Sequence, residues 1–131
     1  VINVEYTLPG CPPDRNEIND FLKHVLMGRK FKNNNSPVCV ECRLKENSCL
    51  LEQNKICLGP ITAGGCDAIC TSKGLKCYGC RGLTDDANFK GYFEMMKDKG
   101  ISETEVKKIM ETFMARKVNK KLKGTKWQTL H

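Results

Sequence analysis

The fold is decided by the stretch from Cys39 to Cys80, which reads CVECRLKENSCLLEQNKICLGPITAGGCDAICTSKGLKCYGC. Eight of the nine cysteines of the chain lie in it: Cys39, Cys42, Cys49, Cys57, Cys66, Cys70, Cys77 and Cys80. The surrounding residues 33–82 are rich in Cys, Gly, Asn and Lys and poor in large aliphatic side chains. Such a segment buries too little apolar surface to offset its chain entropy. We therefore expect covalent or coordinate bonds to hold it together.

Disulfides, zinc and iron–sulfur clusters could each supply these bonds. An odd total of nine cysteines and no signal-peptide pattern at the start disfavour a complete disulfide framework. The pairs Cys39-x2-Cys42 and Cys77-x2-Cys80 are zinc half-sites, but they lie farther apart than in a zinc ribbon, and both histidines lie outside the stretch. Four thiolates complete one cubane cluster, so eight match two clusters. Iron–sulfur clusters are favoured, and two cross-braced zinc ions stay open as the alternative.

The residues before this stretch predict a strand, a tight loop and a helix. Residues 1–8 alternate between apolar and polar side chains, which predicts a short strand. A Pro-Gly turn then places the ninth cysteine, Cys11, in a tight loop. Asp14 can cap a helix that runs to about Met27 and ends at Gly28. The expected apolar face of this helix consists of Ile18, Phe21, Leu22, Val25 and Leu26.

The residues after the stretch predict two more helices. Asp85 or Asp86 can cap the first, which closes at Gly100, and a capping box from Ser102 to Glu105 opens the second. Their apolar residues are Phe89, Phe93 and Met96 in the first helix and Val106, Ile109, Met110 and Phe113 in the second. We expect a mostly α and irregular fold, a small domain stabilised by clusters. Its parts are residues 1–32, a two-cluster region 33–86, and C-terminal helices with a basic tail, 87–131.

Charge and missing motifs limit the functions. Much of the net charge of +7 comes from a tail without acidic residues: Arg116, Lys117, Lys120, Lys121, Lys123 and Lys126. Aromatic residues do not interleave with these cations, so a solvated helix end or a docking surface anchored by Trp127 is favoured over a nucleic-acid arm. The sequence has no membrane-span pattern, phosphate loop, dinucleotide fingerprint or zinc-protease motif. We expect no substrate active site on this chain.

Several motifs together resemble one family. The chain is similar to the C-terminal half of the small, electron-transferring subunit of nickel–iron hydrogenases. The resemblance is to the cytoplasmic group in particular, the methyl-viologen-reducing (F420-non-reducing) hydrogenases of methanogens and the archaeal sulfhydrogenases. The matching stretches are Pro9-Gly10-Cys11-Pro12-Pro13, Val38-Cys39-Val40-Glu41-Cys42, Glu46-Asn47-Ser48-Cys49-Leu50-Leu51, Cys57-Leu58-Gly59-Pro60-Ile61-Thr62, Gly65-Cys66, Cys77-Tyr78-Gly79-Cys80-Arg81-Gly82 and Asp86-Ala87-Asn88-Phe89.

This resemblance implies ligands for three clusters in a row. The distal four-iron set is Cys39, Cys42, Cys49 and Cys57. The medial four-iron set is Cys66, Cys70, Cys77 and Cys80, and interleaved ligation, as in small two-cluster ferredoxins, stays open. Cys11 is implied as one ligand of a proximal [4Fe-4S] cluster, whose other ligands belong to a flavodoxin-like half that is absent here. Residues 1–8 would be a strand remnant of that half.

The resemblance also implies a function. The chain would relay electrons between a nickel–iron site on a partner large subunit and a cytoplasmic acceptor. The other implied partners are a polypeptide bearing the missing half and a flavin, ferredoxin-like or heterodisulfide reductase-type acceptor. A wire between heterodisulfide reductase or formate dehydrogenase subunits without hydrogenase activity, or a zinc-stabilised adaptor, are the alternatives. Basic residues near the cysteines either offset cluster charge or are plain surface residues: Lys45, Lys55, Lys73, Lys76 and Arg81.

Overall fold

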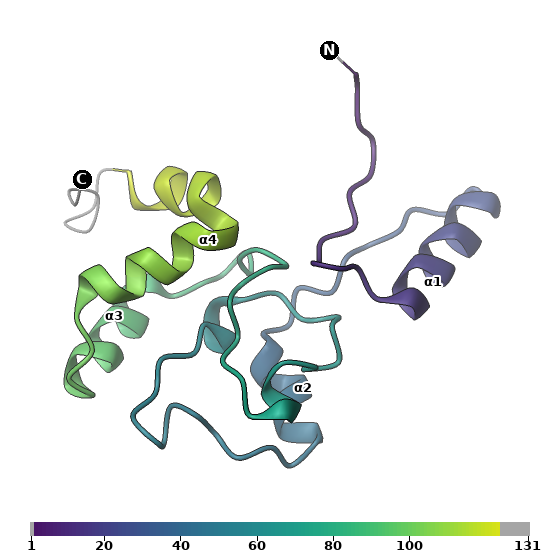
Figure 1. Ribbon diagram of the computed structural model, residues 1–131. Coiled ribbons are helices and arrows are strands. Elements are labelled where there is room, and N and C mark those ends of the chain that lie inside the picture. Colours follow the sequence, from purple (N-terminus) through teal and green to yellow (C-terminus); the bar gives the residue numbers. More distant parts are fainter. Residues whose placement is uncertain (1, 124–131) are drawn as a thin grey trace.

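The computed structural model describes residues 2–123, which are mostly helical and irregular. The helices are α1 (Arg15–Leu26), α2 (Val38–Leu44), α3 (Phe89–Asp98) and α4 (Glu103–Leu122), with two 3-10 turns, η1 (Gly59–Ile61) and η2 (Thr71–Lys73). In Figure 1, α1 lies on one side, α3 and α4 lie on the opposite side, and α2 and the irregular cysteine stretch lie between them. The expected mostly α and irregular fold is confirmed for these residues. None of the described helices combines the length and the apolar character needed to cross a membrane.

The strand expected over residues 1–8 is wrong for residues 2–8, and Val1 lies outside the described residues. This segment has alternating side chains, but a strand also needs a neighbour that pairs with its backbone N–H and C=O groups. No such neighbour lies beside it within residues 2–123, where the β pairing consists of two isolated bridges, Pro37 with Ala63 and Thr62 with Leu83. Ile2 and Val4 are therefore exposed.

Helix α1 begins and ends where the sequence predicts. The Asp14 carboxylate accepts hydrogen bonds from the backbone N–H groups of Asn16 (2.9 Å) and Glu17 (3.1 Å), which satisfies two donors of the first turn. Gly28 follows the last turn at φ 65°, a conformation that favours glycine. The predicted apolar face is only partly covered, because none of the α1 residues is buried and Leu26 is 85% exposed.

Helix α2 is a feature that the sequence analysis missed. It lies inside the cysteine stretch, where turns seemed to predominate, and its seven residues are too few for a periodic signal. Pro37 precedes its first residue, and the Val38 N–H donates to the Thr62 carbonyl at 2.9 Å. The spacing of three residues places Cys39 and Cys42 one turn apart on neighbouring positions of the helix.

Helices α3 and α4 form the apolar core beside the cysteine stretch. Asn88 caps α3 by accepting the Gly91 N–H at 2.9 Å, so the expected Asp85 or Asp86 cap is wrong. The short Asn side chain directly before Phe89 is in the position from which the first turn can be capped. The end at Gly100 (φ 74°) and the start of α4, where Ser102 Oγ accepts the Glu105 N–H at 3.2 Å, are confirmed.

Helix α4 is kinked at Met114, which has non-helical backbone angles (φ −133°, ψ 22°). Val106 and Met110 are fully buried as expected, whereas Phe113 is 46% exposed. Met114 and Val118 are also buried, so a row of buried side chains at every fourth position continues past the kink.

The predicted basic docking surface falls mostly on side chains that lie outside the described residues. These are Arg116, Lys117, Lys120, Lys121 and Lys126, with the expected anchor Trp127. Lys123 is exposed.

Two contacts attach the helical pair to the cysteine stretch. The Tyr92 hydroxyl of α3 donates to the Cys57 carbonyl at 2.8 Å, and Tyr92 is 3% exposed. Gly79, at φ 79°, lies between two cysteines, and a side chain at this position would collide with the end of Met114 at the α4 kink. The helices therefore stabilise the positions of backbone segments that carry cysteines.

The first prediction concerns this hydrogen bond. Tyr92→Phe should lower the free energy of unfolding by about 1–3 kcal/mol, because it leaves the buried Cys57 carbonyl without a donor. Denaturant unfolding of anaerobically purified protein measures the change. The control Tyr78→Phe removes a hydroxyl from an exposed side chain and should cost less than about 0.5 kcal/mol. Equal costs for the two variants would contradict the assigned role of Tyr92.

Candidate metal centres

The first four cysteines of the stretch come together around helix α2 and the loop after it. Cys39 and Cys42 lie on α2, and a Cβ atom at Gly59 would be 3.1 Å from Cys39 Sγ and 3.6 Å from Cys57 Sγ. Burial raises the pKa of Cys39 to about 12, and the charges of its three neighbours, Cys57, Cys42 and Cys49, act in the same direction. Four thiols this close repel one another once ionised.

This group opens to the surface. Cys39, Cys42 and Cys49 line a hollow of about 370 Å³, while Cys57 is buried. The Asn47 side-chain amide lies 3.7 Å from Cys42 Sγ and donates to Ser72 Oγ at 3.0 Å. Asn47 was not singled out from the sequence, although it stands in one of the quoted motifs. Its amide can stabilise negative charge on the Cys42 sulfur.

The remaining four cysteines line a second cavity, of about 400 Å³, and Cys11 lines it with them. The cysteines in its wall are Cys11, Cys66, Cys70, Cys77 and Cys80. Burial raises the pKa of Cys77 to about 12, against the opposing effect of the Gly79 backbone N–H. Burial also raises the pKa of Cys80, whose sulfur accepts the backbone N–H of Cys11. The structure thus brings the eight cysteines together as two consecutive fours, with the ninth beside the second.

Backbone hydrogen bonds connect the two groups at Cys57 and Cys77. The Cys77 backbone N–H donates to Cys57 Sγ at 3.3 Å, and the Leu58 N–H donates to the Cys77 carbonyl at 3.0 Å. A residue of the second group therefore supplies a hydrogen bond to a sulfur of the first.

Glu41 forms a second connection. It lies on α2 between Cys39 and Cys42, and its carboxylate accepts the backbone N–H groups of Gly65 and, at 3.0 Å, Ala68. The sulfur of Cys66 is 3.9 Å from the same carboxylate. Ala68 adopts a left-handed conformation (φ 49°), which is uncommon for a residue with a Cβ atom and costs about 1–3 kcal/mol. The Glu41 carboxylate offsets this cost and ties the loop of the second group to the helix of the first.

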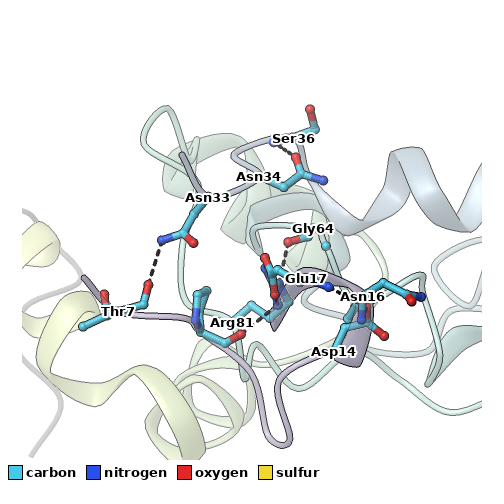
Figure 2. Close-up of polar contacts among 12 residues, drawn as sticks. Thr7, Asp14, Asn16, Glu17, Asn33, Asn34, Ser36, Gly64 and Arg81 are labelled. Carbon is cyan, nitrogen blue, oxygen red and sulfur yellow. Dashed lines mark hydrogen bonds and ion pairs between the residues drawn. The ribbon is translucent and has the colours of Figure 1, made fainter. Parts of the chain in front are cut away.

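Arg81 occupies a different environment from the one expected of a surface residue. Its side chain is 1% exposed, and Figure 2 shows it beside Glu17 and Gly64. Its guanidinium donates to the two Glu17 carboxylate oxygens at 2.5 and 2.7 Å. Burial alone would lower the pKa of Arg81, but the hydrogen bonds and charge of Glu17, together with the charges of Cys66 and Glu41, raise it. The interpretation as a plain surface residue is therefore wrong for Arg81.

The lysines near the cysteines are more exposed than Arg81. Lys45, Lys55 and Lys73 are exposed, and Lys45 forms an ion pair with Asp67 at 2.5 Å. Lys76 lies over the Tyr78 ring, with its nitrogen 5.3 Å from the ring centroid. Exposed pairs of this kind contribute little to stability.

Each kind of metal centre sets its own requirement on the arrangement of the sulfurs. In residues 2–123, no three or more His, Cys, Asp or Glu side chains are arranged to hold a metal ion. A closed zinc site needs four ligands that meet at one ion, with sulfurs about 2.3 Å from it. Here the sulfurs line cavities, which leaves space for an inorganic core between them. Grouped thiols with raised pKa values also fit a centre whose cations stabilise the thiolate form.

The second prediction concerns Glu41. Glu41→Ala should lower the free energy of unfolding by about 2–3 kcal/mol, since it removes charged hydrogen bonds from the Gly65 and Ala68 amides. Anaerobic denaturant titration measures the loss. Glu52→Ala serves as the control because Glu52 is exposed at the rim of the first hollow, and it should change stability by less than about 0.5 kcal/mol. An unchanged denaturant midpoint in Glu41→Ala would show that Glu41 does not stabilise the contact between the two groups of cysteines.

Comparison with known proteins places the chain near hydrogenase subunits. No family model matches it. It is 42% identical over 113 residues to the delta subunit of sulfhydrogenase 2 from Pyrococcus furiosus, covering 86% of this chain and 47% of that protein. It is 41% identical over 102 residues to the vhu G subunit of the F420-non-reducing hydrogenase from Methanocaldococcus jannaschii, covering 64% of this chain and 35% of that protein.

A third relative carries a cofactor in its name. The chain is 29% identical over 110 residues to the iron-sulfur G subunit of the F420-non-reducing hydrogenase from Archaeoglobus profundus, covering 63% of this chain and 34% of that protein. The chain thus spans about half the length of the sulfhydrogenase subunit and about a third of the other two. These similarities confirm the predicted resemblance to subunits of archaeal hydrogenases, over part of their length.

Proposed function

We propose that this chain relays electrons through two [4Fe-4S] clusters in a hydrogenase complex. The observation that carries the proposal is the gathering of eight cysteines into two consecutive fours that meet at the Cys77 N–H and Cys57 Sγ. Similarity to hydrogenase subunits, one of them named an iron-sulfur subunit, supports the same assignment. As an electron-transfer subunit of an oxidoreductase, the chain needs no substrate site of its own.

Each four holds one cluster in this proposal. The distal ligands are Cys39, Cys42, Cys49 and Cys57, and the medial ligands are Cys66, Cys70, Cys77 and Cys80. When bound, each cluster accepts and releases one electron with little movement of atoms. The chain adjusts the ease of reduction through burial and through backbone N–H donors to sulfur, such as Cys77 to Cys57 and Gly79 to Cys77.

The position of each group suggests a direction along the relay. Cys11 is proposed as a ligand of a third, proximal cluster, with its other ligands supplied from outside this sequence. A large subunit with a nickel–iron site would lie beyond it, with a polypeptide that supplies the rest of the proximal site. The distal hollow is open to the surface and would face a cytoplasmic flavin, ferredoxin-like or heterodisulfide reductase-type acceptor. Residues 1–32, 33–86 and 87–131 would then be the proximal region, the two-cluster region and the supporting helices.

The third prediction tests the clusters and their ligands. Anaerobically purified chain should contain about eight iron atoms and about eight acid-labile sulfides. The double variant Cys39→Ala with Cys57→Ala should retain about half of each, because both cysteines belong to the same four. Under interleaved ligation the two cysteines belong to different clusters, and the variant would lose both. Cys11→Ala is the matched control and should retain the full content in the isolated chain.

Two further outcomes would redirect the proposal. Zinc without sulfide in the purified chain would support the zinc-stabilised adaptor. Clusters present in a native complex that reduces no dye with hydrogen would support a wire between other redox subunits, of the heterodisulfide reductase or formate dehydrogenase type. Hydrogen-dependent dye reduction with a bound nickel subunit would support the hydrogenase assignment.

A further inference from the structure

The Arg81 guanidinium contacts three segments that lie 17 to 72 residues away from it in the sequence. It donates from Nη1 to the Pro9 carbonyl at 2.7 Å, from Nε to the Gly64 carbonyl at 2.5 Å, and to both oxygens of Glu17. Pro9 belongs to the turn before Cys11, Glu17 to the first turn of α1, and Gly64 to the loop before Cys66. Figure 2 labels Arg81 with two of these partners, Glu17 and Gly64.

The surrounding backbone is shaped to receive this side chain. A Cβ atom at Gly65 would collide with the guanidinium, and the backbone there has φ 101°, which favours glycine. The side chains of Arg81 and Glu17 are 1% and 11% exposed, so the ion pair is removed from water. A buried pair gains little net stability over apolar residues of similar volume, and one attested use of such pairs is to fix geometry.

The pair also carries almost no net charge. Glu17 contacts the guanidinium with both carboxylate oxygens, so the cation is compensated at the site. The charge of Arg81 still lowers the pKa of Cys66 and Cys80, but it is the smallest of the causes in each case, after burial and the neighbouring hydrogen bonds and charges. Its donors to two backbone carbonyls, in contrast, place chain segments against each other.

The contacts of Arg81 also determine the position of Cys11. Arg81 directly follows Cys80, and it binds the carbonyl of Pro9, two residues before Cys11. The backbone N–H of Cys11 in turn donates to the sulfur of Cys80. The short ring from Cys80 through Arg81 and Pro9 back to Cys11 is thus closed by two hydrogen bonds.

We propose that Arg81 and Glu17 form a positioning clamp that holds the Cys11 turn against the medial cysteines and delivers the Cys11 N–H to the Cys80 sulfur. The clamp keeps Cys11 at the mouth of the medial cavity, next to the site of electron entry. Its effect on a cluster rests on the proposed function, because an N–H donor to a ligand sulfur favours the reduced, more negative state. The clamp itself rests only on the contacts of the chain.

The experiment uses the full 131-residue chain, reconstituted anaerobically with iron and sulfide. Arg81→Met combined with Glu17→Gln removes one positive and one negative charge, so the net charge is kept while the clamp is lost. Hydrogen–deuterium exchange should become faster in peptides over residues 9–13, where only Gly10 and Cys11 carry backbone N–H groups. The reduction potential of the medial cluster, followed by its electron paramagnetic resonance signal, should fall.

A matched pair elsewhere provides the control. Lys45→Met with Asp67→Asn also deletes an ion pair, on the loop of Cys66, but this pair is exposed and is not part of the Arg81 contacts. Exchange over residues 9–13 and the medial potential should both stay at the wild-type values. Wild-type exchange and potential in the Arg81 and Glu17 double variant would overturn the clamp.

Arg81→Lys gives an independent test that also covers poor folding of the double variant. Lysine keeps the charge beside Glu17, but one ammonium group cannot reproduce the planar fork that reaches Glu17, Pro9 and Gly64 together. We expect faster exchange over residues 9–13 and a lower potential of the medial cluster in Arg81→Lys. Wild-type values of both would show that the positive charge alone suffices, and they would overturn the clamp. If the wild-type chain binds no iron and sulfide on reconstitution, the proposed function is refuted. The hydrogen–deuterium exchange of the variants would still test the clamp, because that measurement needs no cluster.

Discussion

The grouping of thiols in a segment with few large apolar residues is the constraint on which the rest of the structure depends. Burial and neighbouring thiols raise the pKa of Cys39 to about 12, and burial does the same for Cys77, so ionised sulfurs at these positions need positive charge among them. Cluster iron would supply that charge and would also crosslink four backbone segments. Under the proposed function, the same feature would account for both the stability of the segment and its capacity to transfer electrons.

The helices act as supports for this segment. Tyr92 of α3 satisfies the Cys57 carbonyl, and the kink of α4 at Met114 packs against Gly79 between two cysteines. Each contact fixes backbone beside a candidate ligand, where small displacements change the hydrogen bonds to sulfur. Such hydrogen bonds are one of the means by which proteins set cluster potentials. Under the proposed function, core packing and cluster potential would therefore be linked through the same atoms.

The sequence predicts the parts of the structure that depend on local chemistry. The cap at Asp14, the stop at Gly100 and the start of α4 follow from side chains within one turn of their effect. The strand over residues 2–8 failed because pairing needs a neighbour, and α2 was missed because seven residues carry no clear period. The roles of Glu41 and Arg81 depend on partners 17 to 72 residues away, which spacing cannot reveal.

Two charged side chains complete the arrangement, on either side of the Gly64–Gly65 pair. A side chain at Gly64 would approach the Glu41 carboxylate to 2.7 Å, and one at Gly65 would collide with the Arg81 guanidinium. Glu41 ties the first group of cysteines to the second, and Arg81 ties the second group to the Cys11 turn. Because electron transfer slows steeply with distance, a relay needs fixed separations between successive sites. Both ties include hydrogen bonds to backbone N–H or C=O groups, so they fix the chain that carries the cysteines.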